Sequence, residues 1–147
     1  MSRLDELKQM VNEAVPAPPI AQLLGIDIIE VEEGETVLEM VATEEMHNPM
    51  GTLHGGILGD LADLAMGYTF YSTLRDDELF TTVEMKTNFL KPIWEGRLRA
   101  ESKIIKRGKS TGLVECNIYD QKGSLVAYVT SICMVIKGGT DGKRHQK

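Results

Sequence analysis

One long apolar segment, from His54 or Gly55 to about Leu74, constrains the fold of this chain more than any other part of the sequence. It begins with glycines and is then almost wholly apolar or small, and only Asp60 and Asp63 interrupt it. The segment is too long for a strand and too rich in Ala, Leu, Met and Gly, so it predicts a helix that is buried on most sides. Such a helix has to be enclosed by the rest of the chain.

The sequence on both sides of this helix alternates with a period of two residues, which is typical of β-strands. The pattern is clearest in residues 97–104, where apolar or small side chains alternate with charged ones. The predicted strands span residues 26–32, 35–42, 83–89, 97–104, 114–118 and 125–136. Two strands, one helix and four further strands predict an α+β domain, in which a curved six-stranded antiparallel sheet wraps around one long central helix. Six strands leave one flank of the helix open, which predicts a dimer.

The two ends of the chain are predicted to lie outside this domain. Residues 2–15 carry apolar side chains at helical spacing, with Ser2 as N-cap, and residues 20–24 are expected to form a helical turn that closes on Gly25. Residues 138–147 are polar and rich in glycine, which is typical of a disordered tail. The expected division is an N-terminal helical segment at 1–24, the folded domain at 25–137 and the tail at 138–147.

The charge of the chain limits its partners. The 147 residues carry a formal net charge of −6, which argues against general nucleic-acid binding because phosphate neutralisation needs a basic face. Residues 91–109 nevertheless hold seven basic and two acidic side chains, a local balance of +5. A confined basic patch on an acidic protein suits one small anionic ligand better than a polyanion.

The sequence shows no signal for membrane insertion or secretion. The longest stretches without Asp, Glu, Lys or Arg are 14 residues long, at 46–59 and 123–136, whereas a membrane-spanning helix needs about 20 residues. The N-terminus lacks the apolar core of a secretory signal, so a cytoplasmic location is expected. In that compartment Cys116 and Cys133 are expected to be reduced and to pack as small core residues.

The sequence His54-Gly55-Gly56 at the start of the predicted helix favours negative charge. Glycines leave the first backbone N–H groups of the helix unhindered, and the positive end of the helix dipole lies behind them. An oxyanion formed from a carbonyl fits such a site. The alternative is that the glycines only allow close packing of the helix on the sheet, which is the commoner explanation for an isolated Gly-Gly.

The two aspartates are a second indication of chemistry, since burying a carboxylate in an apolar helix is costly unless it is paired or used. At about 100° and 1.5 Å per residue, Asp63 lies on the opposite side of the helix from His54 and about 13 Å further along the axis. The two residues can therefore act on one substrate only if they come from different chains across a two-fold axis. For Asp60, a place near an exposed rim or in a salt bridge is favoured over catalysis.

These residues carry a resemblance to a known family. The pattern Asn48-x-x-Gly51-x-x-His54-Gly55-Gly56, followed by Asp63, Thr82 and the turn Lys106-Arg107-Gly108-Lys109-Ser110-Thr111, resembles that of the hotdog-fold acyl-CoA thioesterases of the phenylacetate-degradation type. The resemblance extends from about Gly25 to Ile136. It implies a six-stranded antiparallel sheet around one long helix, dimers joined through the sheet edges and, in many members, pairs of dimers that form tetramers.

The resemblance also implies roles for individual residues. Asp63 matches the catalytic carboxylate, which activates water as a general base or attacks the thioester carbonyl as a nucleophile. Gly55 matches the residue whose N–H polarises that carbonyl, Asn48 a side chain that helps to place the carboxylate or the water, and His54 one that assists the leaving thiol. Thr82 matches a Ser or Thr that faces the reaction centre. Partial desolvation against apolar helix neighbours is expected to raise the pKa of Asp63.

The basic turn completes the implied binding site for coenzyme A. Its 3′-phosphate and pyrophosphate suit charge-assisted hydrogen bonds from Arg107 and Lys109 and from the hydroxyls of Ser110 and Thr111. Gly56 is assigned to the substrate as well. Without the upstream motif, a solvated hairpin tip is the better interpretation of this turn. The expected partners are an acyl-CoA substrate and further copies of the chain in a homodimer or homotetramer, with no cofactor, nucleic acid or membrane.

The expected reaction is hydrolysis of an acyl-CoA thioester to a free acid and coenzyme A. Two alternatives stay open: a catalytically silent module that binds acyl-CoA, and a dehydratase that acts on a hydroxyacyl thioester. A metal site is not expected, because His47 and His54 lack compact ligand spacing to the aspartates, and no Gly-x-Ser-x-Gly elbow supports Ser-His-Asp hydrolysis. Tyr68, Phe70 and Tyr71 are expected to pack in the core or to line the acyl pocket. Aryl groups and short, medium and long acyl chains all remain open.

Overall fold

The structure is a computed structural model of the 147-residue chain, and it describes residues 1–138. This part holds the helices α1 (Arg3–Val11), α2 (Pro19–Leu24) and α3 (Gly55–Tyr71), and a single 3₁₀ turn at Glu44–Met46. The strands are β1 (Asp27–Glu32), β2 (Glu35–Ala42), β3 (Glu78–Phe89), β4 (Gly96–Arg107), β5 (Thr111–Asp120) and β6 (Leu125–Lys137). The six predicted strands and the central helix are therefore confirmed, with the helix ending at Tyr71 rather than near Leu74.

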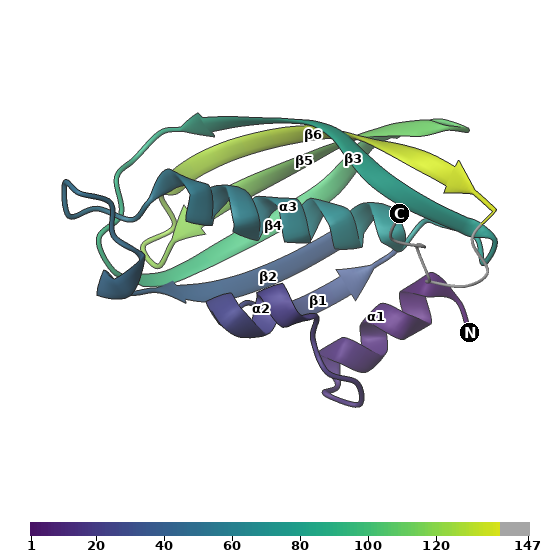
Figure 1. The fold of residues 1–147 in the computed structure, drawn as a ribbon, viewed down its shortest axis with the longest axis horizontal. Coiled ribbons are helices and arrows are strands. Elements are labelled where there is room, and N and C mark those ends of the chain that lie inside the picture. Colours follow the sequence, from purple (N-terminus) through teal and green to yellow (C-terminus); the bar gives the residue numbers. More distant parts are fainter. Residues whose placement is uncertain (139–147) are drawn as a thin grey trace, which may run out of the picture.

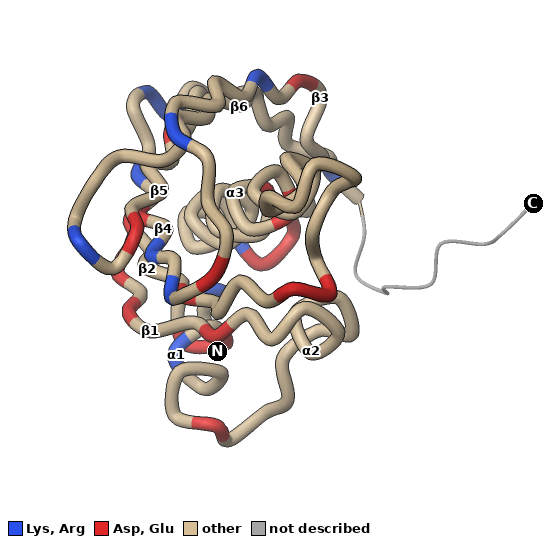
Figure 2. Tube along the Cα trace, turned by 90° about the vertical axis from the view of Figure 1, so that its left-hand side faces the viewer, with Lys and Arg blue, Asp and Glu red and all other residues tan. Residues whose placement is uncertain are grey.

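The six strands form one antiparallel sheet in the order β1-β2-β4-β5-β6-β3. The sheet curves around α3, which lies along its concave face (Figure 1). Viewed along α3, the strands follow one another around the helix, from β1 near the bottom of the view to β3 at the top (Figure 2). The predicted α+β architecture, with the sheet wrapped around one central helix, is confirmed.

The core lies between α3 and the inner face of the sheet. The buried side chains of α3 include Leu58, Leu61, Ala62, Ala65, Met66 and Phe70. On β4, Leu98, Ala100 and Ser102 are at most 4% exposed, as their alternation with charged residues predicts. Cys116 and Cys133 are free and buried, which confirms their prediction as core residues.

The N-terminal segment differs from its prediction at one end. Ser2 caps α1 as expected, because its hydroxyl accepts a hydrogen bond from a first-turn N–H at 3.1 Å as part of a capping box. The helix nevertheless ends at Val11 rather than near position 15, because the chain leaves it at Asn12 and Glu13 then adopts a left-handed conformation, with φ of 56°. The predicted turn before Gly25 is confirmed as α2, which closes on this glycine at φ of 67°.

Strand β3 forms one edge of the sheet and exposes large apolar side chains. Val83, Met85 and Phe89 are 52%, 39% and 60% exposed, and the loop that follows adds Leu90 and Trp94, each more than half exposed. An apolar edge strand is suited to pairing with another chain. This edge supports the predicted dimer, which stays a prediction.

Three further expectations concern the chain as a whole. Among the residues that the structure describes, no helix is long and apolar enough to cross a membrane. The His, Cys, Asp and Glu side chains of residues 1–138 form no group of three or more that could hold a metal ion. The division at residues 24 and 137 stays a prediction, and the predicted tail lies, apart from Gly138, outside the described residues.

Candidate active site

Three glycines of α3, at positions 55, 59 and 67, face strand β3 and define a glycine face of the helix. The nearest side chains of β3 are Phe89 at Gly55, Met85 at Gly59 and Phe80 at Gly67. A Cβ atom at these positions would lie between 3.0 and 3.6 Å from the nearest atom of β3. The glycines therefore let β3 lie close to the helix, which is the alternative that the sequence left open for Gly55.

Every fourth residue of α3 from Gly55 to Gly67 lies on the glycine face. Asp63 is the one residue of this series that is not a glycine. It lies between Gly59 and Gly67 and its side chain is exposed. The hydroxyl of Thr82 on β3 lies close enough to act on the carboxylate and to lower its pKa. The sequence predicted Asp63 and Thr82 separately, and the structure brings them together across the glycine face.

A buried thiol lies behind Thr82. The register of β3 and β6 pairs Thr82 with Cys133, directly before a bulge in β3. The Thr82 hydroxyl lies 3.9 Å from the Cys133 sulfur, and the Ser131 hydroxyl lies 3.5 Å from the same atom. Burial raises the pKa of the Cys133 thiol, so it stays protonated and supports Thr82 from the core side. No pattern in the sequence indicates this neighbourhood, because only the pairing of β3 with β6 creates it.

A groove of about 400 Å³ runs along α3 from Asp60 past Asp63 to Tyr71. Its other walls come from α1, from α2 and the proline before it, and from β3. The lining residues are Glu6, Leu7, Met10, Pro18, Ile20, Asp60, Asp63, Leu64, Gly67, Tyr68, Tyr71, Phe80 and Thr82. Phe70 is buried in the core, as predicted, and Tyr68 and Tyr71 line this groove, whose use by an acyl group stays a prediction. Below we call this space the acyl groove, after the group that is predicted to occupy it.

The pKa of the Asp63 carboxylate is raised above its ordinary value. Burial against the apolar walls of the groove raises its pKa above the usual value of 3.8, and the negative charge of Asp60 raises it further. The Thr82 hydroxyl offsets part of this rise. The expected direction of the shift is therefore confirmed, and Asp60, predicted as a rim residue, contributes to it from an exposed position.

The N-terminus of α3 is open to a ligand. His54 is the N-cap, but its exposed side chain makes no capping hydrogen bond, and its carbonyl accepts a bond from the Ile57 N–H at 3.0 Å. Within residues 1–138, no oxygen accepts a hydrogen bond from the N–H of Gly55 or Gly56. The first turn of α1, in contrast, is capped by Ser2. Two free donors thus lie at the positive end of the helix dipole, as the sequence predicts for this turn.

The side chain of Asn48 holds the loop that leads into α3. Its Oδ1 accepts hydrogen bonds from the N–H groups of Met50 at 2.9 Å and Thr52 at 3.2 Å, and its Nδ2 donates to the Thr52 hydroxyl at 2.9 Å. Gly51 adopts a left-handed conformation inside this loop, with φ of 84°. In this chain Asn48 therefore braces the approach to His54, and the predicted contact of Asn48 with the carboxylate or the water stays a prediction.

The two halves of the predicted catalytic centre are far apart within one chain. Gly55 and Asp63 are separated by eight residues of continuous helix, which corresponds to about 12 Å along the axis. One carbonyl group cannot contact a donor and a carboxylate at that separation. One chain thus presents an open N–H site at the start of α3 and a carboxylate in the middle of the same helix.

The turn between β4 and β5 lies beside the other end of α3. Lys109, Ser110 and Thr111 are exposed there, and Lys109 forms no salt bridge with any residue in the described part of the chain. Lys109 lines a hollow of about 640 Å³ whose other charged lining residues have both signs: Arg75, Arg107 and Lys137, and Glu33, Glu35 and Glu78. Since α3 has 17 residues, this turn lies about 25 Å from Gly55 of the same chain.

Arg107 belongs to the predicted coenzyme A site, but its guanidinium already makes contacts within the chain. Its Nε donates a hydrogen bond to the Thr73 hydroxyl at 3.1 Å, its Nη1 donates to the Gly108 carbonyl, and its Nη2 pairs with the buried Glu78 carboxylate at 3.5 Å. The guanidinium also lies 4.8 Å from the centre of the Phe70 ring. The role of Arg107 toward a phosphate stays a prediction, and a ligand there has to compete with Glu78.

Comparison with known proteins places the chain in a family. A family model described as Thioesterase superfamily matches residues 50–127. The chain is 33% identical over 107 residues to the 1,4-dihydroxy-2-naphthoyl-CoA hydrolase of Listeria monocytogenes, a match that covers 73% of this chain and 87% of that protein. It is 37% identical over 109 residues to the acyl-coenzyme A thioesterase PaaI of Escherichia coli, with 73% of this chain and 75% of that protein covered.

The fold agrees with these matches. A solved structure of the E. coli PaaI protein from the phenylacetic acid degradation operon has a TM-score of 0.82 and 30% identity, and it covers 93% of this chain and 98% of that chain. The resemblance and the hotdog fold that the sequence predicted are therefore confirmed. The chain belongs to the thioesterase superfamily and is a PaaI-like thioester hydrolase with the hotdog fold.

Proposed function

We propose that this thioesterase hydrolyses acyl-CoA thioesters to a free carboxylic acid and coenzyme A, with Asp63 as the reactive carboxylate. The observation that carries the proposal is the position of Asp63, a partly desolvated carboxylate in an apolar groove on the glycine face of α3. A raised pKa makes the ionised form a better base. The carboxylate either takes a proton from water as the water attacks the thioester carbonyl, or attacks that carbonyl itself before water releases the acid.

The thioester carbonyl is held by the Gly55 N–H of a second chain in this proposal. The open N-terminus of α3 offers a donor to the oxyanion that forms when the carbonyl is attacked. Because Gly55 and Asp63 of one chain are about 12 Å apart, a two-fold axis has to bring Asp63 of one chain to Gly55 of its partner. The apolar edge strand β3 supports such pairing. His54 lies beside the same donor, where it can assist the leaving thiol.

The names of two relatives support the choice of substrate. The E. coli relative is named as an acyl-coenzyme A thioesterase and the L. monocytogenes relative as a 1,4-dihydroxy-2-naphthoyl-CoA hydrolase. In this chain the acyl group is assigned to the acyl groove, and the phosphates of coenzyme A to the exposed turn with Lys109, Ser110 and Thr111.

The direct test follows thiol release from a panel of aryl- and alkyl-CoA thioesters with a thiol-reactive dye and identifies the acid product by mass spectrometry. The proposal expects free acid and free coenzyme A in equal amounts. The panel also includes a 3-hydroxyacyl-CoA, and an enoyl product of this substrate that remains attached to coenzyme A identifies a dehydratase instead. Tight binding of every thioester without any turnover identifies a silent binding module.

Replacing Lys109 by alanine is expected to raise the KM for acyl-CoA about twofold to fivefold, because an exposed charge contact is worth on the order of 1 kcal/mol or less. The same acyl group on N-acetylcysteamine, which lacks the phosphates, should show an unchanged KM. Lys122→Ala removes one charge from another exposed turn and is the matched control. An equal rise of KM for both thioesters would assign Lys109 a structural role instead.

The pH dependence of kcat/KM is expected to follow the ionisation of the Asp63 carboxylate. The ionised carboxylate is the reactive form on either route, so activity falls when the pH drops through the raised pKa, and this acid limb lies above pH 3.8. Asp60→Asn removes the neighbouring charge that raises this pKa, and it should move the limb to lower pH. A limb that stays in place in Asp60→Asn would mean that another group controls the profile.

A further inference from the structure

Helix α1 forms one wall of the acyl groove, although it lies outside residues 50–127, the part that the family model matches. Glu6, Leu7 and Met10 line the groove from α1, and Leu7 is fully buried. The spacing of these residues places them along one side of the helix. The N-terminal segment therefore contributes directly to the space that the acyl group is proposed to occupy.

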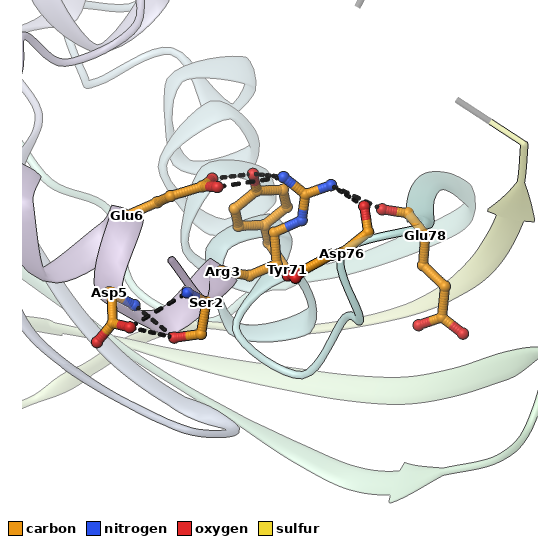
Figure 3. Close-up of polar contacts among 7 residues, drawn as sticks. All are labelled: Ser2, Arg3, Asp5, Glu6, Tyr71, Asp76 and Glu78. Carbon is orange, nitrogen blue, oxygen red and sulfur yellow. Dashed lines mark hydrogen bonds and ion pairs between the residues drawn. The ribbon is translucent and has the colours of Figure 1, made fainter. Parts of the chain in front are cut away.

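Arg3 holds α1 against the C-terminal end of α3. Its Nη1 donates a hydrogen bond to the Tyr71 hydroxyl at 2.9 Å, and its Nη2 donates to the carbonyl oxygens of Asp76 and Glu78, both at 3.2 Å (Figure 3). The guanidinium lies 5.1 Å from the centre of the Tyr71 ring. The Tyr71 hydroxyl donates in turn to Glu6, whose carboxylate also pairs with Arg3 at 3.3 Å. One side chain thus ties the first turn of α1 to the end of α3 and to the loop after it.

This network lies at the end of the acyl groove away from Asp63, where Glu6 and Tyr71 line it. Tyr71 follows Asp63 by eight residues, so about 12 Å of helix separates them. Burial, and then the hydrogen bond to Glu6, raise the pKa of Tyr71 to about 12, so the phenol keeps its proton and remains a donor. The Tyr71 hydroxyl, the Glu6 carboxylate and Nη1 of Arg3 all have partners within the network. Among the described residues, Nε of Arg3 is buried without a partner.

Met10 lies between the acyl groove and a second space. It lines the groove and also a hollow of about 450 Å³ between the end of α1 and the start of β1. The hollow is formed by residues between positions 10 and 17 and between 26 and 29. A methionine is long and flexible, so it fills an irregular gap such as this one. Shortening it to alanine would let the groove continue into the hollow.

We propose that α1 sets the size of the acyl group that this enzyme accepts, with Met10 as the specificity-determining residue and Arg3 as the residue that positions the helix. The inference rests on the proposed acyl-CoA hydrolysis. An acyl chain that enters past Asp63 runs along α3 toward Tyr71, and the α1 wall decides how far it extends. Chains longer than the groove have to displace Met10, whereas shorter chains leave apolar surface unfilled.

The test measures kcat/KM for acetyl-, butyryl-, hexanoyl-, octanoyl-, decanoyl- and palmitoyl-CoA and for an arylacetyl-CoA, with wild type, Met10→Ala and Met10→Trp. The ratio of kcat/KM for long over short chains is expected to rise about tenfold in Met10→Ala and to fall about tenfold in Met10→Trp, since one methylene group in a pocket discriminates by about tenfold or more. The change should lie in KM rather than in kcat. Gln9→Ala and Gln9→Trp make the same changes at a neighbouring position that does not line the groove.

Opposite shifts in the two Met10 variants support the inference, because a loss of stability alone would move both in the same direction. Identical profiles in wild type and both variants, or equal losses with every substrate, overturn it while the proposed hydrolysis stands. Absence of turnover by wild type with all substrates overturns the proposed function itself, and the inference with it.

Arg3 is tested separately, because it acts through the position of α1. Arg3→Met keeps most of the length of the side chain and removes every donor that holds Tyr71, Asp76 and Glu78. The expected result is a flatter dependence of KM on chain length, with kcat for hexanoyl-CoA retained and with partial return of the discrimination in Arg3→Lys. A profile as steep as that of wild type would show that the network has no part in specificity.

Discussion

Asp63→Asn is expected to lower kcat/KM for the best acyl-CoA substrate by about 10²–10⁴-fold, the usual contribution of a positioned acid–base group. The amide has the size of the carboxylate, but it neither accepts a proton from water nor attacks a carbonyl. The loss is therefore expected for a general base and for a nucleophile alike. Thiol release at substrate concentrations below and above KM measures it, and release equal to that of wild type would remove Asp63 from the reaction.

The stability of the same variant is the control. The expected direction of the change in Tm follows from the raised pKa of Asp63. Between the unfolded and the folded pKa the folded chain holds more protons, so the free energy of unfolding decreases as the pH rises through that window. At neutral pH the ionised carboxylate therefore costs the folded state stability. Asp63→Asn should show a Tm equal to or above that of wild type, so a lower Tm would mean that the loss of activity reflects damage to the fold.

Gly55→Pro is expected to lower kcat by about 10²–10³-fold, the usual effect of removing one oxyanion donor. Gly55 is the first residue of α3, the position where a helix accepts proline best because no intrahelical bond uses its N–H. His54 before it has the extended conformation, with φ of −61° and ψ of 129°, that a residue before proline prefers. Gly55→Ala adds a Cβ near Phe89 as proline does but keeps the N–H, so it is the matched control. Equal losses in the two variants would point to the contact with Phe89 rather than to the lost donor.

The same two variants test whether each site is built from two chains. In a mixed dimer of Asp63→Asn and Gly55→Pro, one site combines both defects and the other combines an intact Asp63 with an intact Gly55. Random reassociation of equal amounts makes half of the dimers mixed, so about one quarter of the wild-type activity should return. No recovery, in a sample whose mixed dimers are verified by mass spectrometry, would place Gly55 and Asp63 in the same site of one chain or remove one of them from the site.

The sequence was sufficient where a single periodic pattern determines the structure. The alternation along β4 and the apolar run of α3 each depend on local residues, so both elements could be predicted, together with the open helix start at Gly55. The end of α1 could not, because Glu13 takes a left-handed conformation that residue type alone does not indicate. Contacts between distant segments could not be predicted either. Glu78 pairs with Arg107 only after the sheet has formed, and Met10 lines the acyl groove only after α1 has packed against α3.

The glycine face has a consequence for the order in which this chain folds. Glycine in a helix interior is about 1 kcal/mol less favourable than alanine, and Gly59 and Gly67 both lie inside α3. The helix therefore has little stability of its own and depends on the sheet that encloses it. Strands β4, β5 and β6 are joined by short turns and can associate without it. The helix that carries the reactive carboxylate thus consolidates late in folding, on a sheet that is already formed.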